Sequence, residues 1–407
     1  MVNTGDTAWV LASAALVMLM TPGLALFYGG MVRRKNALGT VMQSFIIIAI
    51  ISVQWVLWGY TLAFGPDWHG IIGRLDWLGL KGVGLEPNTA YAATIPHQAF
   101  MIFQAMFAII TPALITGAFA ERMKFSTFLV FILLWATLVY DPIAHWVWGD
   151  GGWLKNLGAL DFAGGTVVHI SSGVGALAAA LVMGRRLGYG REPMEPHNIL
   201  FVVLGAALLW FGWFGFNAGS AVSSGALATS AFVVTNTAAA MAAVTWTFMS
   251  WIFHGRPSVL GAASGAVVGL VAITPASGFV TPLAAIAIGA GAGIICFLAV
   301  QFRSKVNVDD SLDVWACHGV GGTWGALATG LFATVAVNSA GANGLFYGNP
   351  RQLLIQFIAV AVTWAYAFVA TWVILIILYA VMGLRVKAGE EVAGLDLSQH
   401  GEEAYRL

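Results

Sequence analysis

Long apolar runs constrain this chain more than any other feature of its sequence. Only 9% of its 407 residues are charged and 59% are hydrophobic, whereas a soluble domain is about one quarter charged. The runs are close to the roughly 20 residues that a helix needs to cross a bilayer. Eleven candidate spans follow, at residues 7–31, 38–64, 96–119, 125–147, 161–184, 198–220, 225–253, 258–276, 279–302, 312–335 and 350–383. The sequence therefore predicts an all-α integral membrane protein with eleven transmembrane helices.

Basic residues are distributed unevenly among the connections between these spans. Fourteen of the eighteen Lys and Arg residues fall in alternate connections or in the tail, beginning with Arg33, Arg34 and Lys35. Because cytoplasmic connections carry the excess of Lys and Arg, we expect the N-terminus outside the cell membrane and the C-terminus in the cytoplasm. An odd number of spans satisfies this orientation. No basic residue precedes the first apolar run, so Ala8 onward is expected to be a retained helix.

Two spans carry a histidine in matching surroundings. His169 follows Asp161 by eight positions, His318 follows Asp310 by eight positions, and both segments end in Gly-Ala-Leu. An ionisable ring is costly inside a bilayer, so each histidine is a functional-site hypothesis. The alternative is a buried pair that only joins two helices.

These histidines lie on the fifth and the tenth predicted spans, which divides the first ten spans into equivalent halves. The halves cover about residues 7–184 and 198–335. Because each half has five spans, an odd number, the second half inserts into the membrane in the opposite orientation to the first. Inverted repeats of this kind place the substrate site near the membrane midplane, where the repeats meet. With an extra helix at about 350–383 they form a domain at 1–383, which a cytoplasmic tail follows at 384–407.

Charge and cysteine content disfavour several other classes of protein. The net charge is zero, so neither a nucleic acid nor an acidic partner gains support. The two cysteines, Cys296 and Cys317, lie in apolar segments, so we expect no disulfide framework and no metal cluster. Apart from Cys317, no carboxylate or thiol lies near the histidines at metal-ligand spacing. We predict no cofactor and no enzyme activity.

Several long motifs occur in order along the chain. They are GLALFYGG at 23–30, GAFAER at 117–122, DFAGGTVVH at 161–169, GWFGFNAGS at 212–220, TPA at 274–276 and the segment 313–322. Together they resemble the ammonium transporter (Amt/Mep/Rh) family, on its Amt side, over all eleven spans and into the tail. The resemblance implies transport of ammonium.

An external recruitment site for ammonium is implied at four residues: Trp148, Ser220, Phe103 and Phe107. An indole face attracts a monovalent cation by roughly 0.5–2 kcal/mol, and a serine hydroxyl can accept a hydrogen bond from ammonium. Phe107 and Phe216 resemble a stacked pair that gates the pore against water and ions. Ordinary alternatives exist, because most of the 17 tryptophans, Trp146 included, fit an interfacial belt and most phenylalanines fit a core.

Below the gate, the resemblance implies that His169 and His318 line the pore and hydrogen-bond to each other. A neutral imidazole has one donor and one acceptor nitrogen, so the two rings can share a proton and pass one along. Ammonium would lose its proton at the recruitment site, and ammonia would move past both rings. The proton would travel separately or stay outside.

Acidic and aromatic residues are expected to support this pore. We interpret Asp161 as the cap of its helix, where free N–H groups favour an anion, with negative potential at the recruitment site as a secondary effect. Asp310 and Asp313 are expected to do similar capping on the cytoplasmic side. Other supporting positions are Trp213, Asn217 and Thr274. Trp315, Cys317 and Trp324 depart from the family pattern, and an extra indole near the pore is expected to narrow it.

The segment GLDLSQHGEEAY at 394–405 resembles the cytoplasmic tail motif of the family. The resemblance implies that the tail packs on the cytoplasmic face, that the chain forms a homotrimer with one pore per subunit, and that a PII-type signalling protein docks there.

Three alternative functions remain. A sensor of the same fold would bind ammonium with little flux and signal through its C-terminus. We expect no signalling domain after the tail, because the chain reaches Leu407 two residues past Tyr405. An enzyme with a histidine acid–base pair would need a nucleophile, metal set or cofactor motif. A channel for CO2 would not need the cation site at Trp148 and Ser220.

Overall fold

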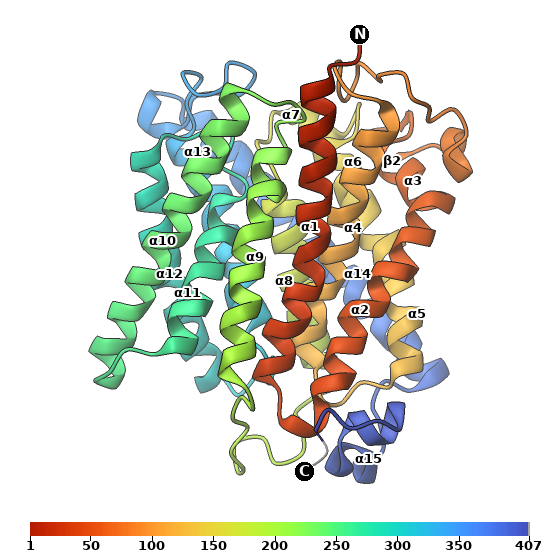
Figure 1. Cartoon of the computed structure of the whole chain (residues 1–407), viewed down its shortest axis with the longest axis vertical. Helices are drawn as coiled ribbons and strands as arrows, with labels where there is room; N and C mark the ends of the chain where they lie inside the picture. The colour runs from red at the N-terminus through yellow and green to blue at the C-terminus, as the bar shows by residue number, and fades with distance from the viewer. Residues whose placement is uncertain (406–407) are drawn as a thin grey trace.

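The computed structural model describes residues 1–405, and eleven helical spans run side by side between its two ends (Figure 1). The first five are α1 (Thr4–Met31); α2 (Ala37–Gln54) with η2 (Trp55–Gly59) and α3 (Tyr60–Phe64); α4 (His97–Phe119); α5 (Phe125–Trp135) with η4 (Ala136–Tyr140) and α6 (Asp141–Trp148); and η5 (Gly165–Ile170) with α8 (Ser171–Met183). The next six are α9 (Ile199–Gly219), α10 (Ala226–His254), α11 (Val259–Ile273), α12 (Pro282–Lys305), η6 (Trp315–Val320) with α13 (Gly321–Phe332), and α14 (Pro350–Met382).

Within residues 1–405, nine of these runs are long and apolar enough to cross a membrane. The shorter α11 and the glycine-rich η6–α13 run complete the eleven. The predicted all-α membrane fold is therefore confirmed. The chain ends lie at opposite ends of the molecule, which we name the N-face and the C-face (Figure 1). Arg406 and Leu407 lie outside the described residues.

Glycine allows α1 and α9, the first spans of the two predicted halves, to pack closely. A Cβ atom at Gly205 would lie 2.4 Å from the Phe27 nitrogen and 2.6 Å from the Gly23 oxygen. A Cβ at Gly212 would lie 2.2 Å from Met20 Cγ. Only a glycine backbone can approach so closely, as is common where helices associate in lipid.

The two histidine-bearing spans cross each other at glycines. A Cβ at Gly173 would lie 2.0 Å from the Gly319 nitrogen, and a Cβ at Gly322 would lie 3.0 Å from His169 Cβ. Both spans begin with a π-helical turn, η5 and η6, which contains the histidine. The crossing brings His169 and His318 together from distant parts of the sequence.

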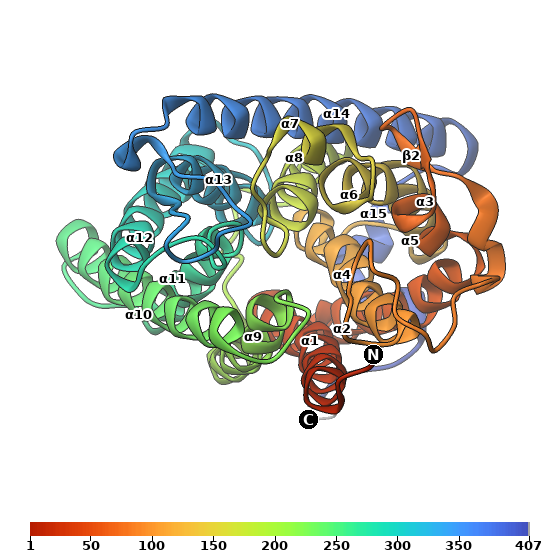
Figure 2. The ribbon, with the colours of Figure 1, turned by 90° about the horizontal axis from the view of Figure 1, so that it is seen from above.

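α14 lies along one side of the molecule, behind α13, α8 and α6 (Figure 2). Its Thr371 hydroxyl accepts a hydrogen bond from Trp135 Nε1 at 2.9 Å, and its Trp364 Nε1 donates to Thr323 Oγ1 at 2.8 Å. Trp135 belongs to the first predicted half and Thr323 to the second. The additional helix therefore joins the two halves.

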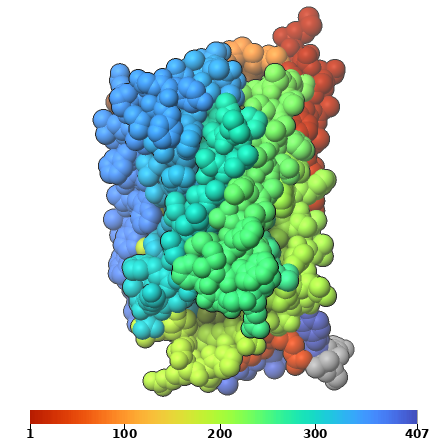
Figure 3. Space-filling view, turned by 90° about the vertical axis from the view of Figure 1, so that its left-hand side faces the viewer, coloured from red at the N-terminus to blue at the C-terminus, as the bar shows by residue number. Residues whose placement is uncertain are grey.

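The side of the molecule in Figure 3 is formed largely by the green and teal helices, which include α10 and α12. Exposed apolar side chains on these helices include Phe248, Ile252, Leu283, Ile286 and Leu298. An apolar face of this kind suits contact with lipid chains.

The connection at 65–95, between the second and third spans, has structure of its own on the N-face. It contains the antiparallel pair β1 (Asp67–Trp68) and β2 (Ile72–Gly73), followed by η3 (Leu75–Leu80). On the same face, α7 (Trp153–Leu157) begins where the Trp153 N–H donates to the Gly70 carbonyl at 3.1 Å.

The tail packs on the C-face through α15 (Ala388–Ala393) and η8 (Asp396–His400). The Asp396 carboxylate accepts hydrogen bonds from the Leu38 and Gly39 N–H groups at 3.1 and 2.8 Å, which caps α2. Gln399 Oε1 accepts one from the Phe125 N–H at 3.2 Å. The tail therefore contacts the C-face ends of the second and fourth spans of its own chain.

A buried ion network joins the two predicted halves at the C-face. Glu121 contacts Arg33 at 2.7 Å and Arg186 at 3.2 Å, and Arg186 also contacts Asp309 at 2.8 Å. Burial acts to raise the pKa of Glu121, but the neighbouring Arg186 and Arg33 guanidinium groups lower it overall. The carboxylate is therefore kept charged between its two partners.

Candidate functional site

A cavity of about 220 Å³ lies between α4, α6 and α9 on the N-face. We name it the N-face vestibule. Its lining includes Tyr91, Gln104, Phe107, Trp148, Lys155 and Ser220. Three of the four residues predicted for the recruitment site thus share one cavity.

Trp148 ends α6 and is held from two sides. Its Nε1 donates to the Asp161 carbonyl at 2.9 Å, and its ring meets Phe107 edge-on, with centroids 5.8 Å apart and an interplanar angle of 86°. These contacts fix the orientation of the indole in the wall of the N-face vestibule.

Ser220 lies just after the end of α9 and offers an oxygen to the same cavity. Its hydroxyl donates to the Phe216 carbonyl at 2.8 Å. Because the proton is engaged there, the lone pairs of Oγ are available to a donor in the vestibule.

Phe107 and Phe216 pack against each other below the vestibule, with ring centroids 4.3 Å apart and the rings tilted by 37°. The structure places Phe103 behind Phe107, where it is fully buried with its ring centroid 5.0 Å away. Phe103 therefore supports the Phe107 ring from behind and lies outside the cavity lining.

A narrow passage continues past Phe216 to the histidines. The space here is about 10 Å³, at the lower limit for one water molecule. Its wall is aliphatic or aromatic apart from His169 and His318. The passage therefore supplies almost nothing to replace the hydration shell of an ion.

His169 and His318 meet through their Nδ1 atoms at 3.2 Å. His169 is 1% exposed, and its ring stacks near Trp213 at 5.4 Å and Phe216 at 6.0 Å. Its Nε2 has no hydrogen-bond partner in residues 1–405. In a direct hydrogen bond between two Nδ1 atoms, one ring must donate and the other must accept.

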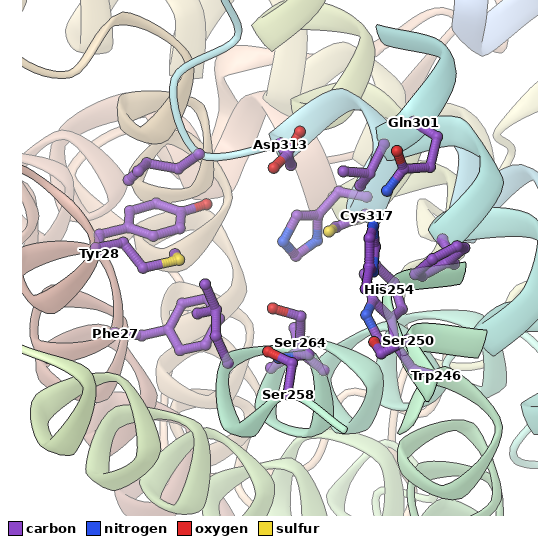
Figure 4. A pocket seen from close by; sticks show the side chains of 18 residues that line it. Phe27, Tyr28, Trp246, Ser250, His254, Ser258, Ser264, Gln301, Asp313 and Cys317 are labelled. Carbon is purple, nitrogen blue, oxygen red and sulfur yellow. The ribbon is translucent and has the colours of Figure 1, made fainter. Parts of the chain in front are cut away.

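Beyond His318, a second cavity of about 210 Å³ opens toward the C-face, and we name it the C-face vestibule. Figure 4 shows Tyr28, His254, Ser258, Ser264 and Asp313 around its open centre. His318 and Cys317 belong to its lining. This wall is more polar than that of the narrow passage, so it suits a hydrated or charged species.

Asp161 caps the helix that carries His169. Its Oδ1 accepts from the Gly164 and Gly165 N–H groups, both at 2.7 Å, and its Oδ2 accepts from the Thr166 N–H at 2.7 Å and the Thr166 hydroxyl. Since its backbone carbonyl also holds Trp148, one residue positions the π-helical turn η5 and the indole together.

The two aspartates before the His318 helix, Asp310 and Asp313, have different roles: one caps the helix and the other forms an ion pair. Asp310 Oδ2 accepts from the Trp315 N–H at 2.7 Å and caps η6. Asp313 differs from the expected cap, because its carboxylate pairs with Arg303 at 2.6 Å. Burial raises the pKa of Asp313 to about 6, although Arg303 opposes the shift.

The other three predicted supports, Trp213, Asn217 and Thr274, take part in two side-chain pairs beside the passage. Trp213 Nε1 donates to Thr274 Oγ1 at 2.9 Å, which joins α9 to the end of α11. Asn217 Nδ2 donates to Thr235 Oγ1 at 2.9 Å. Trp213 lines the passage, and Thr274 fixes its ring.

Two expectations about tryptophan need correction. Trp146, expected in the interfacial belt, is only 7% exposed, because its Nε1 donates to the Ile71 carbonyl at 2.7 Å and its ring packs on Tyr366. Trp324, expected to narrow the pore, donates from Nε1 to the Ile288 carbonyl at 2.9 Å and turns toward α12. It does not line the passage.

Sequence reasoning missed three polar residues of the N-face vestibule: Gln104, Tyr91 and Lys155. Gln104 lies one turn before Phe107, and its Oε1 has no hydrogen-bond partner in residues 1–405. An amide side chain in the apolar middle of a span is the available signal. The Tyr91 hydroxyl donates to the Phe64 carbonyl at 2.6 Å, and nothing in its local sequence marks it.

The described part of the chain contains no candidate site for a metal ion. No group of three or more His, Cys, Asp or Glu side chains in residues 1–405 has the geometry to hold a metal ion.

Comparisons with known proteins agree with the fold. The sequence model of the Ammonium Transporter Family matches residues 8–405. An ammonium transporter of Bacillus subtilis (strain 168) is 56% identical over 403 residues, covering 99% of this chain and 98% of the other. The crystal structure of Saccharomyces cerevisiae Mep2 superposes with a TM-score of 0.90 at 37% identity, covering 96% of this chain and 89% of that one. A sensor Amt protein superposes with a TM-score of 0.90 at 32% identity, covering 97% and 98%.

Eleven spans around one narrow passage define a multi-pass membrane transport protein. The chain belongs to the Ammonium Transporter Family, on the Amt side, as its motifs predicted. The proteins of this family are transporters and not enzymes, and ammonium is their substrate.

Proposed function

We propose that the chain recruits ammonium in the N-face vestibule, releases its proton there, and conducts ammonia past Phe107 and Phe216 to the C-face vestibule. The observation that carries this proposal is the pair of histidines, His169 and His318, in contact at 3.2 Å inside the apolar passage. Family membership supports the coarser activity, transport of ammonium across a membrane.

Recruitment rests on the chemistry of the vestibule wall. The Trp148 indole and the Phe107 ring offer aromatic faces, and Ser220 offers a hydroxyl oxygen. Ammonium suits both kinds of contact, whereas Na⁺ prefers a dense shell of oxygen ligands that aromatic rings cannot replace. Asp161 adds negative potential close to Trp148.

Discrimination against K⁺ rests on proton loss. K⁺ and ammonium are similar in size, so the vestibule alone cannot separate them. An ion that entered the passage of about 10 Å³ would lose its hydration shell without replacement. Ammonium can become neutral by losing a proton and K⁺ cannot, so only ammonium gives a species that passes.

The histidine pair provides the polar contacts along this route. One shared proton between His169 and His318 makes one ring the donor and the other the acceptor. Ammonia can accept a hydrogen bond from a ring N–H or donate one to a ring nitrogen. Its passage therefore does not require either ring to become charged. The route of the released proton decides whether transport carries current.

Orientation follows from the distribution of basic residues. We place the N-face outside the cell membrane and the C-face in the cytoplasm, because thirteen of the seventeen Lys and Arg residues within 1–405 belong to the C-face connections and tail. In this arrangement the two halves, about 7–184 and 198–335, are inverted repeats, and the extra helix and the tail at 384–407 follow them.

For assembly, we propose a homotrimer with one pore in each subunit and a docking site for a PII-type signalling protein at the C-face. The family resemblance supports both, and the packed tail offers an ordered surface. Native mass spectrometry of the purified protein tests the trimer, since a monomer or dimer would contradict it. Pull-down with a PII protein tests the docking.

Current through the protein in supported liposomes tests the transport function. On an ammonium jump we expect a sustained current, or sustained uptake without current if the proton stays outside, with no response to K⁺. Methylammonium serves as the substrate analogue. A transient that decays without net flux would contradict transport and favour the sensor alternative.

A further inference from the structure

Lys155 brings a cationic side chain to the wall of the N-face vestibule. Its Nζ lies 5.9 Å from the centroid of the Tyr91 ring and 3.4 Å from the Trp148 carbonyl oxygen. A lysine head is a primary ammonium group. It therefore uses the two kinds of contact, an aromatic ring and an oxygen acceptor, that the vestibule offers to free ammonium.

The short helix α7 fixes where this side chain starts. Leu154 is fully buried beside Lys155, and Asn156 Nδ2 donates to the Gly151 carbonyl at 2.9 Å. The helix ends at Leu157 and is capped by Gly158, whose φ of +98° favours glycine. The backbone of Lys155 is therefore anchored, although the side chain itself is exposed to solvent.

We propose that Lys155 sets the apparent affinity of the N-face vestibule for cations by acting as a tethered ammonium at its entrance. An entering cation approaches a like charge and competes with Nζ for the Tyr91 ring. Asp150, on the connection before α7, supplies a negative charge that offsets part of this repulsion. The inference rests on the proposed recruitment of ammonium at Trp148 and Ser220.

Two consequences distinguish a charge effect from a change of shape. Repulsion acts on every monovalent cation, so ammonium and methylammonium should respond to loss of the charge by the same factor. Because Lys155 is solvent-exposed, the effect should also shrink as ionic strength rises.

Lys81 provides a matched control. It lies on the same face and is exposed, and its Nζ makes no hydrogen bond, ion pair or cation–π contact within residues 1–405. Lys81→Gln removes one positive charge from this face without changing the vestibule wall.

The experiment measures initial uptake of labelled methylammonium by intact cells that lack other ammonium transporters, with ammonium as the competitor. Lys155→Met and Lys155→Gln should lower the half-saturating methylammonium concentration and the ammonium inhibition constant by about three- to tenfold at low ionic strength. Lys155→Arg and Lys81→Gln should stay within about twofold of the unmodified protein. Added salt should reduce the difference.

Unchanged constants in both Lys155→Met and Lys155→Gln would overturn the proposal. An equal shift in Lys155→Arg would overturn it too, because that variant keeps the charge. If only one of the two neutral variants is produced, the result for that variant decides. Failure of the unmodified protein to take up methylammonium, or unchanged recruitment in Trp148→Leu, would contradict the proposed function, whereas failure at Lys155 alone leaves that function standing.

Discussion

The two histidine-bearing helices share a sequence pattern but lie in different surroundings. His169 is 1% exposed and packs against Trp213 and Phe216, with the packed phenylalanine pair between it and the N-face vestibule. His318 is 4% exposed and lines the C-face vestibule directly, beside Cys317. One histidine faces a closed aromatic end, and the other faces an open polar end.

This difference locates the selective step of the proposed route. In the proposed route, ions are stopped where aromatic rings fill the space, so deprotonation precedes Phe107 and Phe216, on the N-face side of His169. The C-face vestibule needs no second barrier, because a neutral molecule that reaches His318 meets polar groups and regains a proton from solvent.

The aspartates that cap the two histidine-bearing helices also differ, in the number of hydrogen bonds that each one accepts. Asp161 accepts hydrogen bonds from four backbone N–H groups and one hydroxyl and also holds Trp148 through its carbonyl. Asp310 accepts one N–H within hydrogen-bond distance, and its Oδ1 has no partner in the described chain. The N-face end is therefore the more rigidly built of the two.

Replacement of the caps gives the largest expected effect. Asp161→Ala removes the acceptor of five buried donors, at about 1–3 kcal/mol for each one left unsatisfied, which together is comparable to the whole stability of a folded domain. Asp310→Ala removes one cap, worth about 1 kcal/mol. We expect Asp161→Ala to abolish uptake and lower the thermal midpoint by far more than Asp310→Ala does. Equal losses in the two variants would contradict the asymmetry between the helices.

Loss of the Trp148 indole, which we propose recruits ammonium, gives an intermediate effect. Trp148→Leu removes a cation–π contact of roughly 0.5–2 kcal/mol, so the half-saturating ammonium concentration should rise by about two- to thirtyfold. Trp68→Leu, an exposed tryptophan on the same face, serves as the control and should leave this concentration unchanged. The comparison fails if both variants behave alike in uptake measurements.

The pH dependence of stability at the C-face gives the smallest effect. The folded pKa of Asp313 is raised from 3.8 to about 6, so its contribution to stability is fully present below about pH 3.8 and is lost as pH rises through 6. Since its side chain is 30% exposed, we expect the loss to be about 1–2 kcal/mol.

Asp313→Asn should remove this pH dependence from the thermal unfolding midpoint between pH 4 and 7. Asp76→Asn is the matched control, because Asp76 forms an exposed ion pair with Arg74 on the N-face. This variant should show the same pH dependence of the unfolding midpoint as the unmodified protein. Parallel pH curves for the unmodified protein and Asp313→Asn would show that the carboxyl does not titrate in this range.

Much of the fold could be predicted from hydropathy alone. The predicted span at 96–119 is observed at His97–Phe119, and the one at 350–383 at Pro350–Met382. Length and apolar composition suffice because a membrane helix must satisfy its backbone hydrogen bonds internally. The matched spacing of Asp161 and His169 with Asp310 and His318 also indicated two equivalent helices.

Other features depend on contacts that no local pattern reveals. The π-helical turns η5 and η6 arise where two helices cross at Gly173 and Gly319, far apart in sequence. Trp146 is buried because the 65–95 segment folds over it, and hydropathy cannot distinguish such a tryptophan from one at the membrane interface. In the sequence, Lys155 cannot be distinguished from any other surface lysine, because only the folded chain places it near Tyr91.

The most direct test of the central claim is ammonium uptake and K⁺ exclusion in proteoliposomes that contain His318→Leu. Leucine cannot share a proton with His169, so the account predicts a reduced ammonium flux, a leak of K⁺, or both. Wild-type uptake together with unchanged exclusion of K⁺ would contradict the role assigned to the histidine pair.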